Sequence, residues 1–301
     1  MPEEWTLRRR ITLSGAEVAF DVLGFGPPLL LVHGTPTNSH IWRNVAQRLA
    51  DRFTVYTFDL HGFGQSERRE NLDVSISNQA RVLAELVETL NLEVPSIAGH
   101  DIGGAIALRA HLLEGVPSGC IALIDSVALR PWITPTTRHM KVHLDAYETM
   151  PTETFEAVVA SHLSTATYRA MDETTLATYL DQWRGEFGQR LYLQNTAQLD
   201  EKDTADFEPL LPTITVPVRI IWGEQDAWLP PPQPNACTNS SPAPISSFCP
   251  TPVTSPWKIA HKKSPQPSST SSPTAAPRNP ADRSWSDPRS LRLSRFPLPP
   301  N

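Results

Sequence analysis

The sequence lacks the features that mark a secreted or membrane-bound protein. It has only three cysteines in 301 residues, an odd number without metal-ligand spacing, which argues against a disulfide framework. The N-terminal stretch MPEEWTLRRR is charged and has no apolar core, so it does not predict a signal peptide. No apolar run approaches the roughly 20 residues that span a membrane. We therefore expect a soluble protein of the reducing cytoplasm with no membrane partner.

Glycine is missing from the C-terminal part of the chain. All 14 glycines precede Pro231, whereas residues 231–301 hold 17 of the 30 prolines and 14 serines. Residues 1–230 carry 18 basic and 30 acidic side chains, a net charge of −12, and residues 231–301 carry 8 and 2, a net charge of +6. The basic side chains are scattered and match no nucleic-acid-binding motif, so we expect no nucleic-acid partner. This composition predicts a disordered tail.

Before the tail, apolar strands alternate with amphipathic helices. Such alternation predicts a mostly parallel sheet with helices on both faces, an α/β fold. The expected strands are residues 16–24, 27–34, 53–60, 94–99, 120–126 and 216–223, and the expected helices are residues 41–50, 77–92 and 102–113.

Residues 131–208 show no strand pattern and predict a helical cap over the carboxyl edge of the sheet. The expected organisation is therefore a core formed by residues 1–130, the cap at 131–208, a last core strand with its loop at 209–230, and the tail at 231–301.

The stretch GHDIGG puts a carboxylate at the tip of a sharp strand-to-helix turn. In the pattern small-x-nucleophile-x-small, the middle residue adopts a strained backbone conformation and projects beside the N-terminus of the helix. Gly99 and Gly103 remove side chains where strand and helix crowd together, and Gly104 lets the helix pack closely on the sheet. Asp101 is the middle residue, which predicts a nucleophilic carboxylate.

Residues 1–230 resemble the α/β-hydrolase fold, and GHDIGG resembles its Asp-nucleophile branch, the epoxide hydrolases and haloalkane dehalogenases. Three further blocks carry the resemblance in the expected order: HGTPTNSHIW at His33–Trp42, DLHGFGQSE at Asp59–Glu67, and WGEQDAW from Trp222. The resemblance implies that a carboxylate attacks an sp³ carbon of a small organic substrate and forms an alkyl ester, without a cofactor or metal. A His-activated water then hydrolyses the ester.

The resemblance also implies roles for the loop that follows the second expected strand. The backbone N–H groups of Thr35 and Ile102 are the expected oxyanion hole. His33, Gly34 and Pro36 are expected to shape the loop, and His33 is not expected to do catalytic work.

The leaving group is less closely specified. Typical haloalkane dehalogenases hold the halide with a Trp after the nucleophile and an Asn or Glu after His-Gly, where this chain has Ile102 and Thr35. Epoxide hydrolases tolerate these positions better and use cap tyrosines to protonate the opening oxygen, so the sequence favours epoxide opening, with haloalkane dehalogenation as the alternative. The cap tyrosines that fit this role are Tyr147, Tyr168, Tyr179 and Tyr192.

The carboxylate that orients the catalytic His is expected at Asp226, with Asp125 in reserve. The family places the His on a loop after one more strand, yet the only His of the tail is His261, which has neither a preceding strand nor a neighbouring Gly. The sequence as written therefore predicts an enzyme that cannot turn over.

A shifted reading frame accounts for the missing part. If the third base of each codon joins the first two bases of the next, the tail permits a helix, an apolar strand, Asp-Ala-Gly-His-Phe and an acidic helix. The His then falls across the codons of Val253 and Thr254, and the shift falls near Pro231–Gln233. A second class of function is also possible on the sequence alone: a non-catalytic binding protein that keeps the hydrolase fold and binds partners through its basic tail.

Overall fold

The computed structural model describes residues 5–229, which all belong to one compact unit of the chain. The predicted tail, its His261 and the predicted site of the frame shift lie outside the described residues. The strands are β1 (Arg9–Leu13), β2 (Ala16–Leu23), β3 (Pro28–Val32), β4 (Thr54–Phe58), β5 (Ser96–Asp101), β6 (Ile121–Ser126) and β7 (Val218–Ile221).

These strands form one sheet of seven strands in the order β1-β2-β4-β3-β5-β6-β7. The pairs from β4 to β7 are parallel, and β1–β2 and β2–β4 are antiparallel. The predicted α/β class and mostly parallel sheet are confirmed. Strand β3 reads PLLLV and is almost wholly buried, as expected for a central strand covered on both faces.

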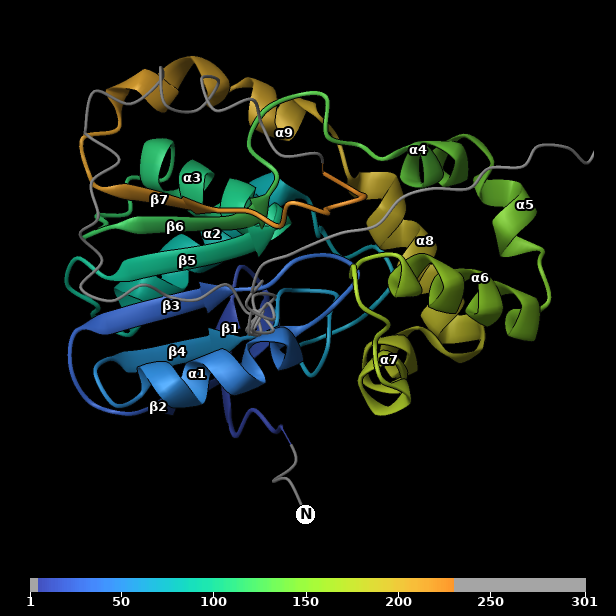
Figure 1. The fold of residues 1–301 in the computed structure, drawn as a ribbon, viewed down its shortest axis with the longest axis horizontal. Coiled ribbons are helices and arrows are strands. Elements are labelled where there is room, and N and C mark those ends of the chain that lie inside the picture. The colour runs from blue at the N-terminus through green and yellow to red at the C-terminus, as the bar shows by residue number, and fades with distance from the viewer. Residues whose placement is uncertain (1–4, 230–301) are drawn as a thin grey trace, which may run out of the picture. The chain divides into compact units, whose positions relative to one another are not determined.

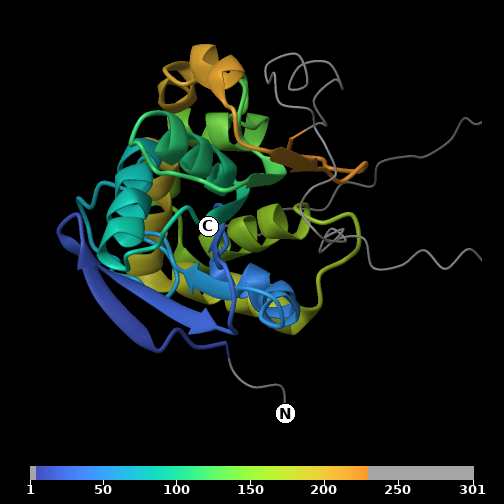
Figure 2. The ribbon, with the colours of Figure 1, turned by 90° about the vertical axis from the view of Figure 1, so that its left-hand side faces the viewer.

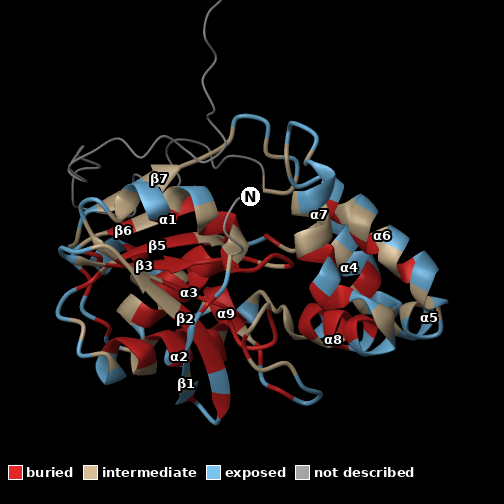
Figure 3. Ribbon diagram, turned by 90° about the horizontal axis from the view of Figure 1, so that it is seen from below, coloured by how far each residue is buried: buried red, intermediate tan, exposed pale blue. Residues whose placement is uncertain are grey.

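Three helices cover the sheet. Helix α1 (Arg43–Leu49), preceded by the 3₁₀ turn η1 (Ser39–Trp42), lies on one face, while α2 (Ile76–Thr89) and α3 (Ile102–Leu112) lie on the other (Figures 1 and 2). Buried residues gather in the central strands and in α3 (Figure 3). Every residue of α3 from Ile102 to Leu108 is buried, so the helix packs closely where it follows β5.

The segment predicted as a cap contains helices and no strand within the described residues. Its helices are α4 (Pro135–Val142), α5 (Leu144–Glu148), α6 (Thr152–Ser164), α7 (Glu173–Leu180) and α8 (Gly185–Gln198), with the 3₁₀ turn η2 (Asp181–Trp183) between the last two. The arrows of β3, β5 and β6 point toward the side where α4 to α8 lie (Figure 1). These helices therefore lie beyond the carboxyl ends of the parallel strands.

A short connection returns the chain from α8 to the sheet. It consists of α9 (Lys202–Ala205) and the 3₁₀ turn η3 (Glu208–Thr213), after which β7 pairs with β6. None of the helices within residues 5–229 is long and apolar enough to cross a bilayer.

Candidate active site

Asp101 ends β5 and serves as the N-cap residue of α3, so strand and helix meet at this one residue. Its φ of +53° and ψ of −126° lie in a region that L-residues with side chains rarely adopt. Such strain persists only where surrounding contacts hold it, and it is typical of functional turns. The conformation agrees with the one expected for the middle residue of the motif.

Glycines allow close backbone approaches in and around the turn that carries Asp101. A Cβ at Gly34 would lie 2.4 Å from the Asp101 Cβ, and one at Gly99 would lie 2.2 Å from the Gly103 carbonyl oxygen. A Cβ at Gly103 would lie 2.4 Å from the Val32 carbonyl oxygen. Distances this short are not seen between real atoms, so the turn has room for hydrogen only at these positions.

The loop after β3 places a donor at the Asp101 carboxylate. The backbone N–H of Thr35 donates to Asp101 Oδ2 at 2.8 Å. Within this loop, His33 is fully buried, its Nδ1 lies 2.9 Å from the Gly34 carbonyl oxygen, and its Nε2 lies 2.9 Å from the backbone N of Leu60. Because the Leu60 N–H must donate, His33 carries its proton on Nδ1 and is neutral. Burial lowers its pKa further, which suits a structural rather than a basic role.

Burial raises the pKa of Asp101 to about 7. The backbone N–H groups of Ile102 and Thr35 act in the opposite direction, since they stabilise the anion, while the carboxylates of Asp226 and Asp125 raise the pKa further. The structure thus brings Asp101 together with both predicted oxyanion donors and with both candidate acids.

The two candidate acids differ in their contacts. Asp125, at the end of β6, has a φ of +44°, and its Oδ1 accepts a hydrogen bond of 2.6 Å from the backbone N–H of Gly223. Asp226 Oδ1 accepts hydrogen bonds from the backbone N–H groups of Trp228 and Leu229, both at 2.9 Å. Burial raises the pKa of both carboxyls, that of Asp125 to about 6. Each is therefore anchored on one side by backbone donors.

The cap tyrosines occupy different environments. Tyr168 is 77% exposed, whereas Tyr179 and Tyr192 are buried and Tyr147 packs at the edge of the core. Burial raises the pKa of Tyr179 to about 12 and raises that of Tyr192 as well. The Tyr179 hydroxyl lies 3.5 Å from an Arg43 guanidinium nitrogen. Tyr179 and Tyr192 are therefore enclosed, Tyr147 is half-buried, and Tyr168 lies at the surface.

Two contacts between the cap and the loops of the candidate site were not predicted from the sequence. In η2, Trp183 Nε1 donates to the Pro36 carbonyl oxygen at 2.8 Å. On α6, the His162 ring stacks on the Trp228 ring at 4.2 Å between centroids, with 9° between the planes. The WGEQDAW block names Trp228 as part of a motif, but no periodicity in the cap distinguishes Trp183 or His162 from ordinary core residues.

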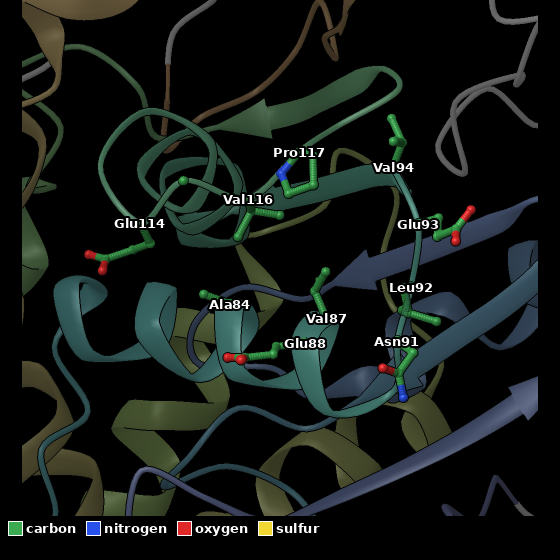
Figure 4. A pocket seen from close by; sticks show the side chains of 11 residues that line it. Ala84, Val87, Glu88, Asn91, Leu92, Glu93, Val94, Glu114, Val116 and Pro117 are labelled. Carbon is green, nitrogen blue, oxygen red and sulfur yellow. The ribbon is translucent and has the colours of Figure 1, made fainter.

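A surface groove occurs at the other end of the sheet. It is lined by the end of α2 and by the loops before β5 and β6, including Leu92, Val94 and Val116 (Figure 4). These loops precede the strands, and Asp101 ends β5. A strand of this length spans about 20 Å, so the groove is separate from the candidate site.

No group of three or more His, Cys, Asp or Glu suited to a metal ion occurs within residues 5–229.

Residues 27–243 match the family model described as alpha/beta hydrolase fold. This chain belongs to that family. A solved structure of an alpha/beta hydrolase fold protein from Burkholderia ambifaria is 34% identical, with a TM-score of 0.76, and the match covers 79% of this chain and 87% of the other. The resemblance noted from the motifs is therefore confirmed at the level of the α/β-hydrolase family.

Two curated relatives point to more specific chemistry over shorter stretches. Haloalkane dehalogenase 2 of Mycobacterium tuberculosis is 41% identical over 101 residues, which cover 32% of this chain and 35% of the relative. The soluble epoxide hydrolase of a Corynebacterium strain is 37% identical over 95 residues, which cover 32% of this chain and 33% of the relative. The matched stretch thus spans about a third of each relative's length. This α/β-hydrolase has dehalogenase and epoxide hydrolase relatives.

Proposed function

We propose that this α/β-hydrolase acts through a nucleophilic Asp101 and an alkyl-ester intermediate, with epoxides as the substrate class. The observation that carries the proposal is the position of Asp101 at the tip of the turn, with φ of +53° and Oδ2 held at 2.8 Å by the Thr35 N–H. A carboxylate held in this way has one oxygen directed at a backbone donor. The other oxygen then serves for attack on carbon.

The first step forms an ester and opens the ring. An Asp101 carboxylate oxygen attacks a ring carbon, the carbon–oxygen bond of the epoxide breaks, and the leaving oxygen takes a proton from a cap tyrosine. Tyr147, Tyr179 and Tyr192 are the candidates for this donor, because Tyr168 is 77% exposed. In the second step, water adds to the ester carbonyl, and the Thr35 and Ile102 N–H groups stabilise the oxyanion that forms.

The raised pKa of Asp101 predicts how the rate of ester formation depends on pH. Only the ionised carboxylate attacks carbon, and burial raises the pKa of Asp101 to about 7. The rate of ester formation is expected to rise with pH and to level off above pH 7. A carboxylate that is hard to ionise is also a stronger nucleophile once ionised.

The side chains beside the nucleophile favour epoxides over haloalkanes. Ile102 and Thr35 offer no indole N–H or side-chain amide for a halide, whereas the cap offers buried phenols for an opening oxygen. Haloalkane dehalogenation is the second candidate, since a dehalogenase is among the relatives at 41% identity over 101 residues.

The second step needs a base that this chain does not supply in the expected place. We assign the orienting acid to Asp226, with Asp125 in reserve, and we propose that a shifted reading frame encodes the matching His across the codons of Val253 and Thr254. The 301-residue chain is therefore expected to form the ester and to stop, whereas a chain translated in the shifted frame is expected to turn over.

Intact-mass spectrometry after incubation with a panel of epoxides and haloalkanes tests the proposal. A covalent adduct located on Asp101 by peptide mapping, formed by an epoxide and absent in Asp101→Asn, is the expected result. Addition of a haloalkane alone would favour the dehalogenase candidate. If no electrophile adds to the folded protein, the non-catalytic binding protein becomes the better account. A tail of this composition in independent relatives would then support that reading.

A further inference from the structure

Two buried side chains of the cap converge on the loop that carries Thr35. Trp183 Nε1 and Gln182 Nε2 donate to the same acceptor, the Pro36 carbonyl oxygen, at 2.8 and 3.0 Å. Both side chains are buried, Trp183 at 1% exposure and Gln182 at 7%. The Pro36 carbonyl is thus fixed from the cap at a point directly next to Thr35.

The Gln182 side chain joins three separate segments. Its Oε1 accepts a hydrogen bond of 2.7 Å from the backbone N–H of Gly64, which fixes the orientation of the amide. Its Nε2 also faces the carbonyl oxygens of Thr37 at 3.4 Å and Tyr179 at 3.2 Å. Gln182 therefore ties the cap to the loop after β3 and to the loop after β4 at once.

The Trp183 ring is held as firmly as its N–H. It packs edge to face on Phe63, with centroids 5.7 Å apart, and on Tyr192, with centroids 5.2 Å apart. Phe63 in turn packs edge to face on His33, with centroids 5.5 Å apart. Aromatic pairs of this geometry contribute about 0.5–1.5 kcal/mol each beyond the area they bury. The indole cannot turn without breaking both ring contacts.

Few rotatable backbone bonds lie between the Pro36 carbonyl group, which the cap holds in place, and the Thr35 N–H. Peptide planes are rigid, and the Pro36 ring fixes its own φ, so roughly three soft torsions remain between them. From the core side, the Gly34 carbonyl oxygen is held by His33 Nδ1 at 2.9 Å and by Thr37 Oγ1 at 3.0 Å. The loop is therefore clamped between the core and the cap.

We propose that Gln182 and Trp183 are positioning residues through which the cap aims the Thr35 N–H at the Asp101 carboxylate. The inference rests on the proposed function in one respect, the use of this N–H as an oxyanion donor. It gives the cap a role beyond covering the substrate. Any displacement of η2 by a bound molecule alters the donor on which ester formation and hydrolysis both depend.

The test compares Trp183→Phe with Trp132→Phe in the full 301-residue chain. Both substitutions keep a buried aromatic ring and remove one indole N–H hydrogen bond, since Trp132 Nε1 donates to Thr204 Oγ1 at 3.0 Å, away from the loop. A second variant, Gln182→Glu, keeps the acceptor for Gly64 and removes the donor to Pro36. The readout is the Thr35 amide signal in nitrogen-15 NMR, followed across pH.

In the unsubstituted chain the Thr35 amide signal is expected to titrate with Asp101, near pH 7. In Trp183→Phe and Gln182→Glu the midpoint moves up by at least half a pH unit, because the anion loses part of its stabilisation, while Trp132→Phe leaves it unchanged. At pH 6, where the raised midpoint leaves less Asp101 ionised, ester formation at saturating epoxide slows about threefold, and the concentration for half-maximal rate is unchanged. A lower maximal rate with an unchanged half-saturating concentration indicates an effect on the reacting atoms rather than on epoxide binding.

A Thr35 signal that behaves alike in all variants would overturn the proposal. Loss of folding in both cap variants, with Trp132→Phe folded, would also overturn it, since the two side chains would then support the whole fold. Failure of the unsubstituted chain to form any ester counts against the proposed function alone. The Thr35 titration still decides the positioning role in that case.

Discussion

The Trp228 indole lies flat on the His162 imidazole, 4.2 Å between centroids and 9° between planes, so the loop that holds Asp226 is stacked on cap helix α6. The indole N–H adds a hydrogen bond of 2.9 Å to Thr165 Oγ1, just beyond the end of that helix. Asp226 Oδ1 accepts from the Trp228 backbone N–H at 2.9 Å. The cap therefore contacts both ends of the candidate site, the Thr35 loop through η2 and the Asp226 loop through α6.

Replacing Trp228 by Ala is expected to loosen the Asp226 loop. The substitution removes the ring stack and the indole hydrogen bond, which together contribute about 1–2 kcal/mol. Hydrogen exchange of the amides in residues 223–229 should rise about tenfold, while exchange in β3 and β5 stays constant. Tyr168→Ala, at a cap residue that is 77% exposed, is the matched control. Equal exchange in the two variants would show that the stack does not hold the loop.

Acid is expected to weaken the contact between α6 and the loop. Burial lowers the pKa of His162 to about 4, so the folded protein binds fewer protons than the unfolded chain between pH 6.5 and 4. The stability that the neutral ring contributes is present above pH 6.5 and is lost as the pH falls through 4. His162→Phe keeps a stacking ring that cannot be protonated, and between pH 7 and pH 4.5 it should lose about 2 kcal/mol less stability than the unsubstituted chain. Denaturant unfolding at pH 7 and pH 4.5 measures the difference.

Asp101 is expected to reduce stability in the opposite pH direction. Its folded pKa of about 7 exceeds the ordinary value of 3.8, so the unfolded chain ionises first as the pH rises between these values. Stability is therefore full below pH 3.8 and falls as the pH rises through 7. Asp101→Asn should raise the free energy of unfolding by about 4 kcal/mol at pH 8 and by little at pH 4. A gain that does not depend on pH would contradict the raised pKa.

The close approach of α3 to β3 gives a prediction about glycine. Gly103→Ala should cost more than about 3 kcal/mol or prevent folding, because its Cβ would meet the Val32 and His33 carbonyl oxygens at 2.4 and 2.6 Å. Gly115→Ala is the control, since that glycine has a φ of +72° and nothing within 4 Å of the added Cβ. It should cost only the left-handed backbone penalty of about 1 kcal/mol. Thermal unfolding of the two variants compares a steric cost with a conformational one.

The sheet was largely predictable, because short apolar runs between amphipathic helices are typical of buried parallel strands. Strand β1 was missed, although RRITL ahead of Ser14-Gly15 carries the signal. Both turn residues have positive φ, +45° and +77°, as a two-residue hairpin requires. The helix predicted to reach residue 92 ends at Thr89, and Asn91 then has a φ of +50°.

The turn around Asp101 was predictable for a local reason, and the cap contacts were not. The conformation of the turn follows from neighbouring glycines, which stand together in the sequence. The contact between Trp183 and Pro36 joins residues 147 positions apart and depends on how the cap sits on the core. No spacing rule encodes such a contact, because any buried Trp in a helical cap has the same local pattern.

The strongest prediction about the whole chain concerns where the reaction stops. Ester formation needs the Asp101 carboxylate, the Thr35 and Ile102 N–H groups and a cap phenol, all within residues 1–230. Ester hydrolysis needs a His to deprotonate water, and His33 is unsuited, because its Nε2 accepts from the Leu60 N–H and its Nδ1 proton faces the Gly34 carbonyl oxygen. The 301-residue chain should therefore take up epoxide as an ester on Asp101 and release no diol, and a chain carrying the shifted C-terminal frame should turn over repeatedly. Sequencing of the DNA around codon 232 establishes which chain the gene encodes. Sustained turnover by the 301-residue chain would exclude this account and would require His261 or some other base to be tested by substitution.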